Sequence, residues 1–135
     1  RKAIEETGKN PLLIRTEDGF AGLFPWVMAE PPFIPRPIMN VLAQERIRNF
    51  DLEQRIFVQI AGDSMEERVR GMETPTLIVW GDKDRTINVA TAEVLRSLLP
   101  RSTVVIMPGI GHVPVIERPR ESADDYLRFR AELPQ

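Results

Sequence analysis

Two short apolar runs, separated by an amphipathic segment, constrain the fold of this chain more than any other feature. The first, TPTLIVWG at residues 74–81, is continuous and closed by glycine, which is typical of a parallel strand buried on both faces. The second, STVVIMPG at residues 102–109, is rich in β-branched residues. Residues 89–99 between them carry a helical apolar pattern. This pattern therefore predicts two adjacent parallel strands joined by a right-handed helical crossover.

Cap residues and apolar faces predict two helices around these strands. Asn88 suits the N-cap of the helix at residues 89–99. Pro119 suits the first turn of a second helix at residues 119–133. Their sheet-facing positions are expected to be Val94, Leu95, Leu98 and Leu99 in the first helix, and Ala123, Tyr126 and Leu127 in the second.

The first half of the chain has a different pattern, which is set by proline. Six of the chain's twelve prolines lie between Pro11 and Pro37, where they interrupt each apolar run before it can form a long helix. This pattern favours short helices and turns. We therefore expect an α/β fold in which an all-helical segment, residues 1–73, precedes a strand–helix–strand–helix core at residues 74–135.

Two helices are expected in the second part of the helical segment. One covers residues 38–50, and the other covers residues 51–62, with Asp51 as its N-cap and Gly62 as its stop. The apolar positions at helical spacing in the first of them are Ile38, Val41 and Leu42.

Composition removes several classes of function. Eighteen basic and twenty acidic side chains are spread evenly along the chain and leave a net charge of −2, so no nucleic-acid partner is expected. The absence of cysteine excludes disulfides, thiolate metal sites and a cysteine nucleophile. No apolar stretch approaches the roughly 20 residues that a membrane-spanning helix needs.

The loops that follow the two strands carry the residues with catalytic chemistry. Ligands gather beyond the carboxyl ends of parallel strands, and the loops there read GDKDR and GIGHVP. An acidic residue can orient one nitrogen of His112 and leave the other free as a base. Asp82 and Asp84 compete for the acidic role, and Asp84 is favoured because Asp82 directly follows Gly81 and can merely shape the turn.

Other interpretations of these loops remain open. A single histidine is more often structural, and a GDKD turn is often only a solvated turn. The stretch DKDRTIN is superficially similar to a calcium loop, but Ile87 stands where that pattern needs glycine. We therefore expect no metal site and no cofactor.

A nucleophile is missing from the pattern. None of the serines lies in G-x-S-x-G, the turn that exposes a catalytic hydroxyl. Ser64 in GDSM comes nearest, but Glu67 follows three residues later, and this spacing favours a helix capping box. The chain contains four serines: Ser64, Ser97, Ser102 and Ser122.

The stretches PTLIVWGDKDRTIN and STVVIMPGIGHVPVIERP resemble the C-terminal end of the α/β-hydrolase fold, over residues 74–132. Asp84, His112, Glu117 and Pro119 match the family motifs one by one. The preceding part resembles the helical cap of bacterial lipases related to monoacylglycerol lipases. The resemblance implies a carboxylic-ester hydrolase of the lipase or esterase type that acts on ester or lipid substrates.

The family arranges its triad in the order serine, aspartate, histidine, so the resemblance places the nucleophile upstream of Arg1. This chain would then be the lid and last strands of a serine hydrolase, with Asp84 as orienter and His112 as general base. By itself it should be inactive. Apolar lid residues could line an acyl pocket, and the candidates for binding substrate are Phe24, Trp26, Met28, Phe33 and Ile34.

Two rival functions stay open. Haloalkane dehalogenases, epoxide hydrolases and carbon–carbon hydrolases share the same final loops, and only the nucleophile would separate them. A non-catalytic fragment or interaction module is the other rival. We further expect the chain to be ordered only with the missing N-terminal half or with another copy of itself, because strand 76–80 would otherwise expose an apolar, unpaired edge.

Overall fold

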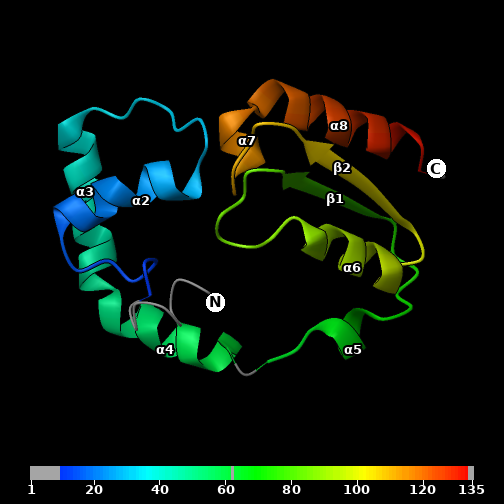
Figure 1. Ribbon diagram of the computed structural model, residues 1–135, viewed down its shortest axis with the longest axis horizontal. Helices are drawn as coiled ribbons and strands as arrows, with labels where there is room; N and C mark the ends of the chain where they lie inside the picture. The colour runs from blue at the N-terminus through cyan, green and yellow to red at the C-terminus, as the bar shows by residue number, and fades with distance from the viewer. Residues whose placement is uncertain (1–9, 62, 134–135) are drawn as a thin grey trace. The chain divides into compact units, whose positions relative to one another are not determined.

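The computed structural model describes residues 10–61 and 63–133, which form two compact units (Figure 1). Of the described residues, the first unit holds the stretch before Pro25 together with Phe33–Asp63. The second unit holds Pro25–Pro32 and the stretch that follows Asp63. The domain boundary expected between residues 73 and 74 stays a prediction.

The first unit is helical. It contains most of α2 (Glu17–Val27) and all of α3 (Arg36–Arg48) and α4 (Phe50–Ala61). The expectation that Asp51 caps α4 is wrong, because the helix begins one residue earlier and Asp51 lies in its first turn. The stop expected at Gly62 lies outside the described residues.

The core of the first unit includes one face of α3. Ile14, Phe20 and Ala43 are buried together, and Met39 and Ile47 of α3 pack against them. The rings of Phe20 and Phe24 meet edge to face, with centroids 5.2 Å apart. The residues whose helical spacing predicted this helix, Ile38, Val41 and Leu42, do lie in α3 and are among the exposed large hydrophobic residues.

The second unit is built on two parallel strands, which confirms the expected strand–helix–strand unit. Strand β1 (Thr76–Gly81) pairs with β2 (Ser102–Met107) in a register that runs from Thr76–Ser102 to Gly81–Met107. Helix α6 (Ala90–Leu98) connects them. The described part of the chain forms a two-stranded sheet, so each strand keeps one unpaired edge.

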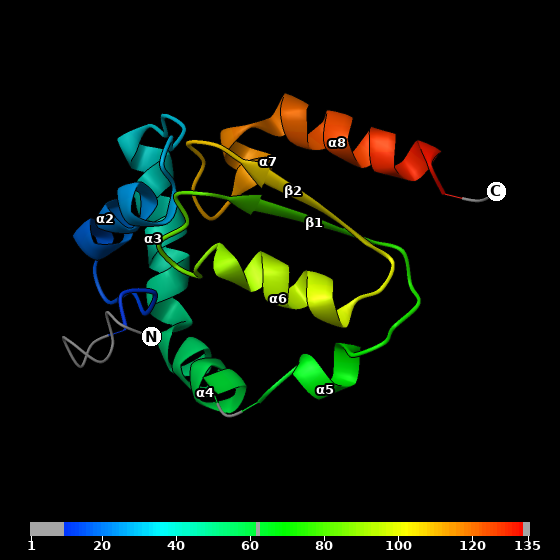
Figure 2. The same ribbon diagram turned by 45° about the vertical axis from the view of Figure 1, so that its right-hand side comes forward.

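Helices cover both faces of this sheet. Helix α6 and α8 (Pro119–Ala131) lie on opposite sides of the strands (Figure 1, Figure 2). The short helix α7 (Pro114–Glu117) precedes α8, and α5 (Glu66–Val69) precedes β1. The expected helix start at Pro119 is confirmed.

The core of the second unit lies between β1 and α6. Ile78, Ala92 and Leu99 are buried together. The predicted cap of α6 is confirmed, because the Asn88 side-chain oxygen accepts from the Ala90 N–H at 2.9 Å. Around this core pack the partly buried residues Val69, Trp80, Leu95 and Val104.

Three details of the helices differ from expectation. Val94 is exposed, although the other three expected positions of α6 are buried or partly buried. Ala123, Tyr126 and Leu127 do not face the two strands but lie on the exposed side of α8. Ser64 does not cap α5: Met65 occupies the N-cap position, without a side-chain hydrogen bond.

Within the described ranges, none of the helices has both the length and the apolar character that crossing a membrane requires.

Candidate active site

Asp84 and His112 meet at one end of the sheet. Strands β1 and β2 end side by side, because Gly81 and Met107 are partners in the register. The loops that follow bring His112 Nδ1 within 2.8 Å of Asp84 Oδ2. The Asp84 side chain is only 3% exposed, whereas that of His112 is 34% exposed. The carboxylate is therefore shielded from water while the imidazole remains accessible.

The orientation of Asp84 is fixed by its own loop. Its second oxygen, Oδ1, accepts from the backbone N–H of Thr86 at 2.8 Å and of Ile87 at 2.9 Å. One carboxylate oxygen thus holds the turn and the other holds His112. An ionised carboxylate only accepts hydrogen bonds, so this contact favours the tautomer of a neutral imidazole in which Nδ1 carries the proton and Nε2 is basic.

Asp82 makes a different contact. Its Oδ1 accepts from the backbone N–H of Gly109 at 2.7 Å, and its Oδ2 lies 3.7 Å from the Lys83 ammonium. Asp82 therefore ties the two loops together, while Asp84 is the carboxylate that the structure brings to His112.

Two glycines allow the second loop to turn toward His112. Gly109 has a φ of 76°, a conformation that residues with a Cβ rarely adopt. A Cβ on Gly111 would lie 2.6 Å from the backbone nitrogen of Ala29 and 2.7 Å from the carbonyl oxygen of Val27. A larger residue would therefore be strained at position 109 by its backbone conformation, and at position 111 it would clash with the backbone of residues 27–29.

Comparison with known proteins identifies the fold. The model of the α/β-hydrolase fold matches residues 15–119. The chain belongs to the α/β-hydrolase family. The resemblance seen in the sequence and the expected fold class are thereby confirmed.

Three relatives of this α/β-hydrolase chain are lipolytic proteins by name. Lipase 1 of Psychrobacter immobilis is 41% identical over 127 residues, which cover 92% of this chain and 40% of that lipase. Monoacylglycerol lipase abhd6-B of Xenopus laevis is 30% identical over 139 residues, covering 98% of this chain and 41% of the relative. The crystal structure of a membrane phospholipase A, described as a bacterial virulence factor, matches with a TM-score of 0.88 and 37% identity.

These matches cover almost all of this chain but less than half of each related protein. The phospholipase match extends over 96% of this chain but 42% of the other. The chain likewise spans about 40% of the length of the curated relatives it matches.

A cavity of about 200 Å³ lies beside the Asp84–His112 pair of the hydrolase. Trp80 is held at its wall by a hydrogen bond from its ring N–H to the carbonyl oxygen of Ile87, at 3.3 Å. Trp80 and Pro114 are not among the site residues expected from the sequence, although Trp80 stands directly before the GDKDR loop. The residues that line the cavity are Val79, Trp80, Gly81, Asp84, His112 and Pro114.

The apolar residues expected to bind substrate are not among those lining this cavity. Phe24 packs against the core of the first unit. Met28 is buried, Trp26 and Ile34 are partly buried, and Phe33 is 91% exposed. A role in substrate binding stays a prediction for all five.

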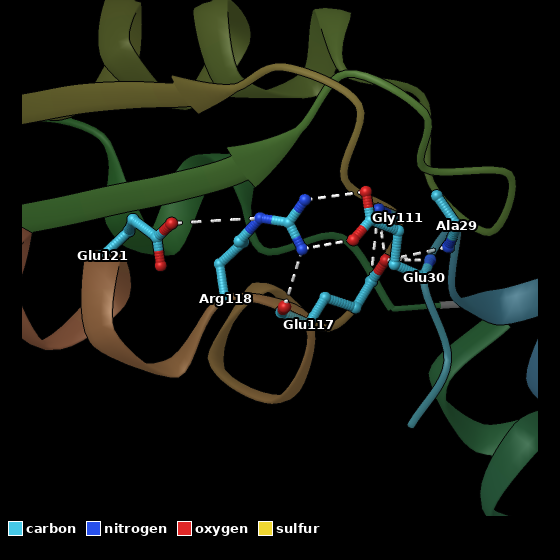
Figure 3. A network of polar contacts seen from close by, with 6 residues as sticks. All are labelled: Ala29, Glu30, Gly111, Glu117, Arg118 and Glu121. Carbon is cyan, nitrogen blue, oxygen red and sulfur yellow. Dashed lines mark hydrogen bonds and ion pairs between the residues drawn. The ribbon is translucent and has the colours of Figure 1, made fainter. Parts of the chain in front are cut away.

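Glu117 is a polar residue of the site that the sequence pointed to only as part of a family motif. Its buried carboxylate accepts from the backbone N–H groups of Gly111 and Val113 in the histidine loop. It also accepts from the N–H groups of Ala29 and Glu30 (Figure 3). Burial raises the pKa of Glu117, but these backbone hydrogen bonds outweigh it, so the pKa lies below its ordinary value.

An ion pair closes this network on its exposed side. The Arg118 guanidinium donates to both carboxylate oxygens of Glu30, at 2.7 Å for the Nη2–Oε1 contact, and its Nε lies 3.9 Å from Glu121 (Figure 3). The hydrogen bond from Arg118 lowers the pKa of Glu30. Over the described residues, no group of three or more histidine, cysteine or acidic side chains is arranged to hold a metal ion.

Proposed function

We propose that the protein containing this chain is a carboxylic-ester hydrolase of the lipase or esterase type, with Asp84 and His112 as two members of its triad. The observation that carries the proposal is the 2.8 Å contact between His112 Nδ1 and the shielded Asp84 carboxylate. The names of the relatives support ester or lipid substrates.

The nucleophile of this mechanism is a serine outside the 135 residues. Among residues 10–61 and 63–133, no serine hydroxyl is hydrogen-bonded to His112. The hydroxyls of Ser97 and Ser102 donate instead to the carbonyl oxygens of Val94 and Leu99. The proposal accordingly makes the isolated chain inactive.

In the proposed reaction, His112 Nε2 takes the serine proton as the hydroxyl oxygen attacks the ester carbonyl carbon. The imidazolium then gives this proton to the leaving alcohol, and a water molecule deprotonated by the same nitrogen hydrolyses the acyl-enzyme. Asp84 keeps Nδ1 protonated throughout and stabilises the positive ring. The catalytic residues of this chain are therefore one base and its orienting acid.

The test is hydrolysis of a p-nitrophenyl ester by the longer protein. His112→Ala is expected to lower kcat by roughly 10⁴-fold or more, because an unassisted serine hydroxyl is a poor nucleophile. Near-normal turnover in this variant would remove His112 from the mechanism. Turnover of a haloalkane or an epoxide in place of the ester would favour the rival reactions with an aspartate nucleophile.

We also propose that the rest of the hydrolase, or another copy of the chain, covers the open sheet edges of the second unit. The support is that each strand has one unpaired edge in the described part of the chain, and that Ile106 in β2 and Tyr126 and Leu127 on α8 are exposed. Sedimentation of the isolated 135 residues should therefore show association or poor order. A monomer that unfolds cooperatively at micromolar concentration would contradict this proposal.

A further inference from the structure

The histidine loop is held through its backbone as well as through its side chain. The N–H of Gly111 lies 3.1 and 3.0 Å from the two Glu117 oxygens, and the N–H of Val113 lies 3.2 Å from Oε1. The N–H of His112, between them, donates to the carbonyl oxygen of Val27 at 2.9 Å. Three consecutive backbone donors around the imidazole thus have defined acceptors.

The same carboxylate holds a second segment, which we call the anchor segment, residues 27–30. Glu117 Oε2 accepts from the N–H of Ala29 at 2.8 Å and of Glu30 at 3.0 Å (Figure 3). The anchor segment supplies the Val27 carbonyl oxygen that receives the His112 N–H. The closeness of the anchor segment to Gly111 leaves no room for a side chain there. Glu117 therefore fixes the loop and the surface on which the loop rests.

The carboxylate of Glu117 is fully used in hydrogen bonds from backbone N–H groups. The residue is only 7% exposed, and its oxygens face four N–H groups. Arg118 donates to the carbonyl oxygen of Glu117 and to the carboxylate of Glu30. Carboxylates held by several backbone donors stay ionised, in accord with the lowered pKa of Glu117. Its lone pairs are occupied, which suits a positioning role and not proton transfer.

We propose that Glu117 is the positioning residue for His112: by accepting from the backbone on both sides of the histidine and from the anchor segment, it sets the place of the imidazole Nε2. This inference rests on the proposed function. A displacement of a catalytic group by about 1 Å can lower turnover by about 100-fold. Loosening the loop should therefore reduce kcat without removing any group that contacts the substrate.

The experiment compares Glu117→Gln with Glu121→Gln in the longer protein. An amide of the same shape offers one acceptor oxygen and turns an NH₂ donor toward the remaining N–H groups. Glu121 is the matched control, because it lies 3.9 Å from Arg118 on the outside of the network and is 61% exposed. Active sites are titrated with a phosphonate that reacts with the nucleophile, so that kcat is expressed per competent site. All assays are run well below the unfolding temperature of each variant.

For Glu117→Gln we expect kcat per titrated site to fall by about 10- to 100-fold, with KM changed by less than about threefold. Glu121→Gln should keep kcat within about twofold. A merely structural role for Glu117 would lower the number of titratable sites and leave kcat per site within about twofold of wild type, and this result would overturn the proposal.

Two further variants make the outcome unambiguous. If Glu117→Gln does not accumulate as folded protein, Glu117→Asp keeps the charge but withdraws it by one methylene group. A loss of about threefold or more in kcat per site would support the proposal, and a smaller loss would overturn it. His112→Ala in the same assay separates the two claims. If His112→Ala keeps its turnover, the proposed function is wrong. If His112→Ala loses turnover but Glu117→Gln has a normal kcat, only the positioning role of Glu117 is wrong.

Discussion

The strand-end loops of the second unit and the helices of the first unit are held by different forces. Around His112, side-chain oxygens of Asp82, Asp84 and Glu117 accept from backbone N–H groups, so polar contacts of defined geometry determine the conformation. In the first unit, a small apolar cluster around Phe20 packs α2 against α3, and none of the residues of α4 is buried. Directional bonds can place an imidazole accurately, whereas apolar packing tolerates wider variation.

The largest effect should come from comparing the two aspartates of one loop in the longer protein. Asp84→Asn is expected to lower kcat for ester hydrolysis by about 10⁴-fold, because the amide no longer holds the required imidazole tautomer. Asp82→Asn should cost much less, since this side chain contacts Gly109 and not the histidine. Steady-state kinetics would decide, and a larger loss at Asp82 would reassign the acid.

Adding a methyl group in each unit should give opposite changes in stability. Gly111→Ala is expected to lower the free energy of unfolding by about 1–3 kcal/mol, because its Cβ would overlap the anchor segment. Gly22→Ala in α2 should raise it by about 0.5–1 kcal/mol, since its Cβ meets nothing within 4 Å and alanine favours helix. Denaturant unfolding measures the change in unfolding free energy for each variant. Changes of the same sign and size in the two variants would contradict the expected difference between the two units.

Acid should weaken the contacts of Glu117. The pKa of this carboxyl is lowered on folding, so its ionised form stabilises the fold above the ordinary glutamate pKa, and that stabilisation is lost as the pH falls through the folded value. The unfolding temperature of wild type should fall more steeply below about pH 4.5 than that of Glu117→Gln. Thermal unfolding at several pH values provides the comparison. Parallel curves for the two proteins would contradict it.

The smallest effect is expected from the surface of the first unit. Arg36 and Asp18 form an ion pair at 2.8 Å, but their side chains are 59% and 91% exposed. Arg36→Ala should therefore change the free energy of unfolding by less than about 0.5 kcal/mol. A loss above about 1 kcal/mol, measured by denaturant unfolding, would show that polar contacts organise the first unit too.

Features with short-range causes could be predicted from the sequence. Both strands of the second unit follow from continuous apolar runs, and the cap at Asn88 follows from the chemistry of one side chain. The sequence favours Asp84 over Asp82 as the carboxylate that orients the histidine, because Asp84 lies further into the loop. Its 2.8 Å contact with His112 agrees with that preference, while the catalytic role stays a prediction.

Features that depend on distant partners could not be predicted in the same way. The hydrogen bond from Ala29 to Glu117 joins residues 88 positions apart, and no local pattern announces it. The packing face of α3 depends on which apolar side chains meet it, so the helical spacing of Ile38, Val41 and Leu42 does not reveal that Met39 and Ile47 pack against the core. Tyr126 and Leu127 were expected to face the sheet but are exposed on α8. The chain spans about 40% of the length of its curated relative, Lipase 1.

A double-mutant cycle on turnover tests whether Asp84 and His112 act together in the proposed triad. Asp84→Asn, His112→Ala and the double variant are compared in the longer protein, with kcat for a p-nitrophenyl ester expressed per titrated site. Because the acid acts only through the imidazole, the double variant should be no slower than His112→Ala within about threefold. If the double variant is slower than His112→Ala by the full factor measured for Asp84→Asn, the two residues act independently. That result would contradict the proposed Asp84–His112 partnership.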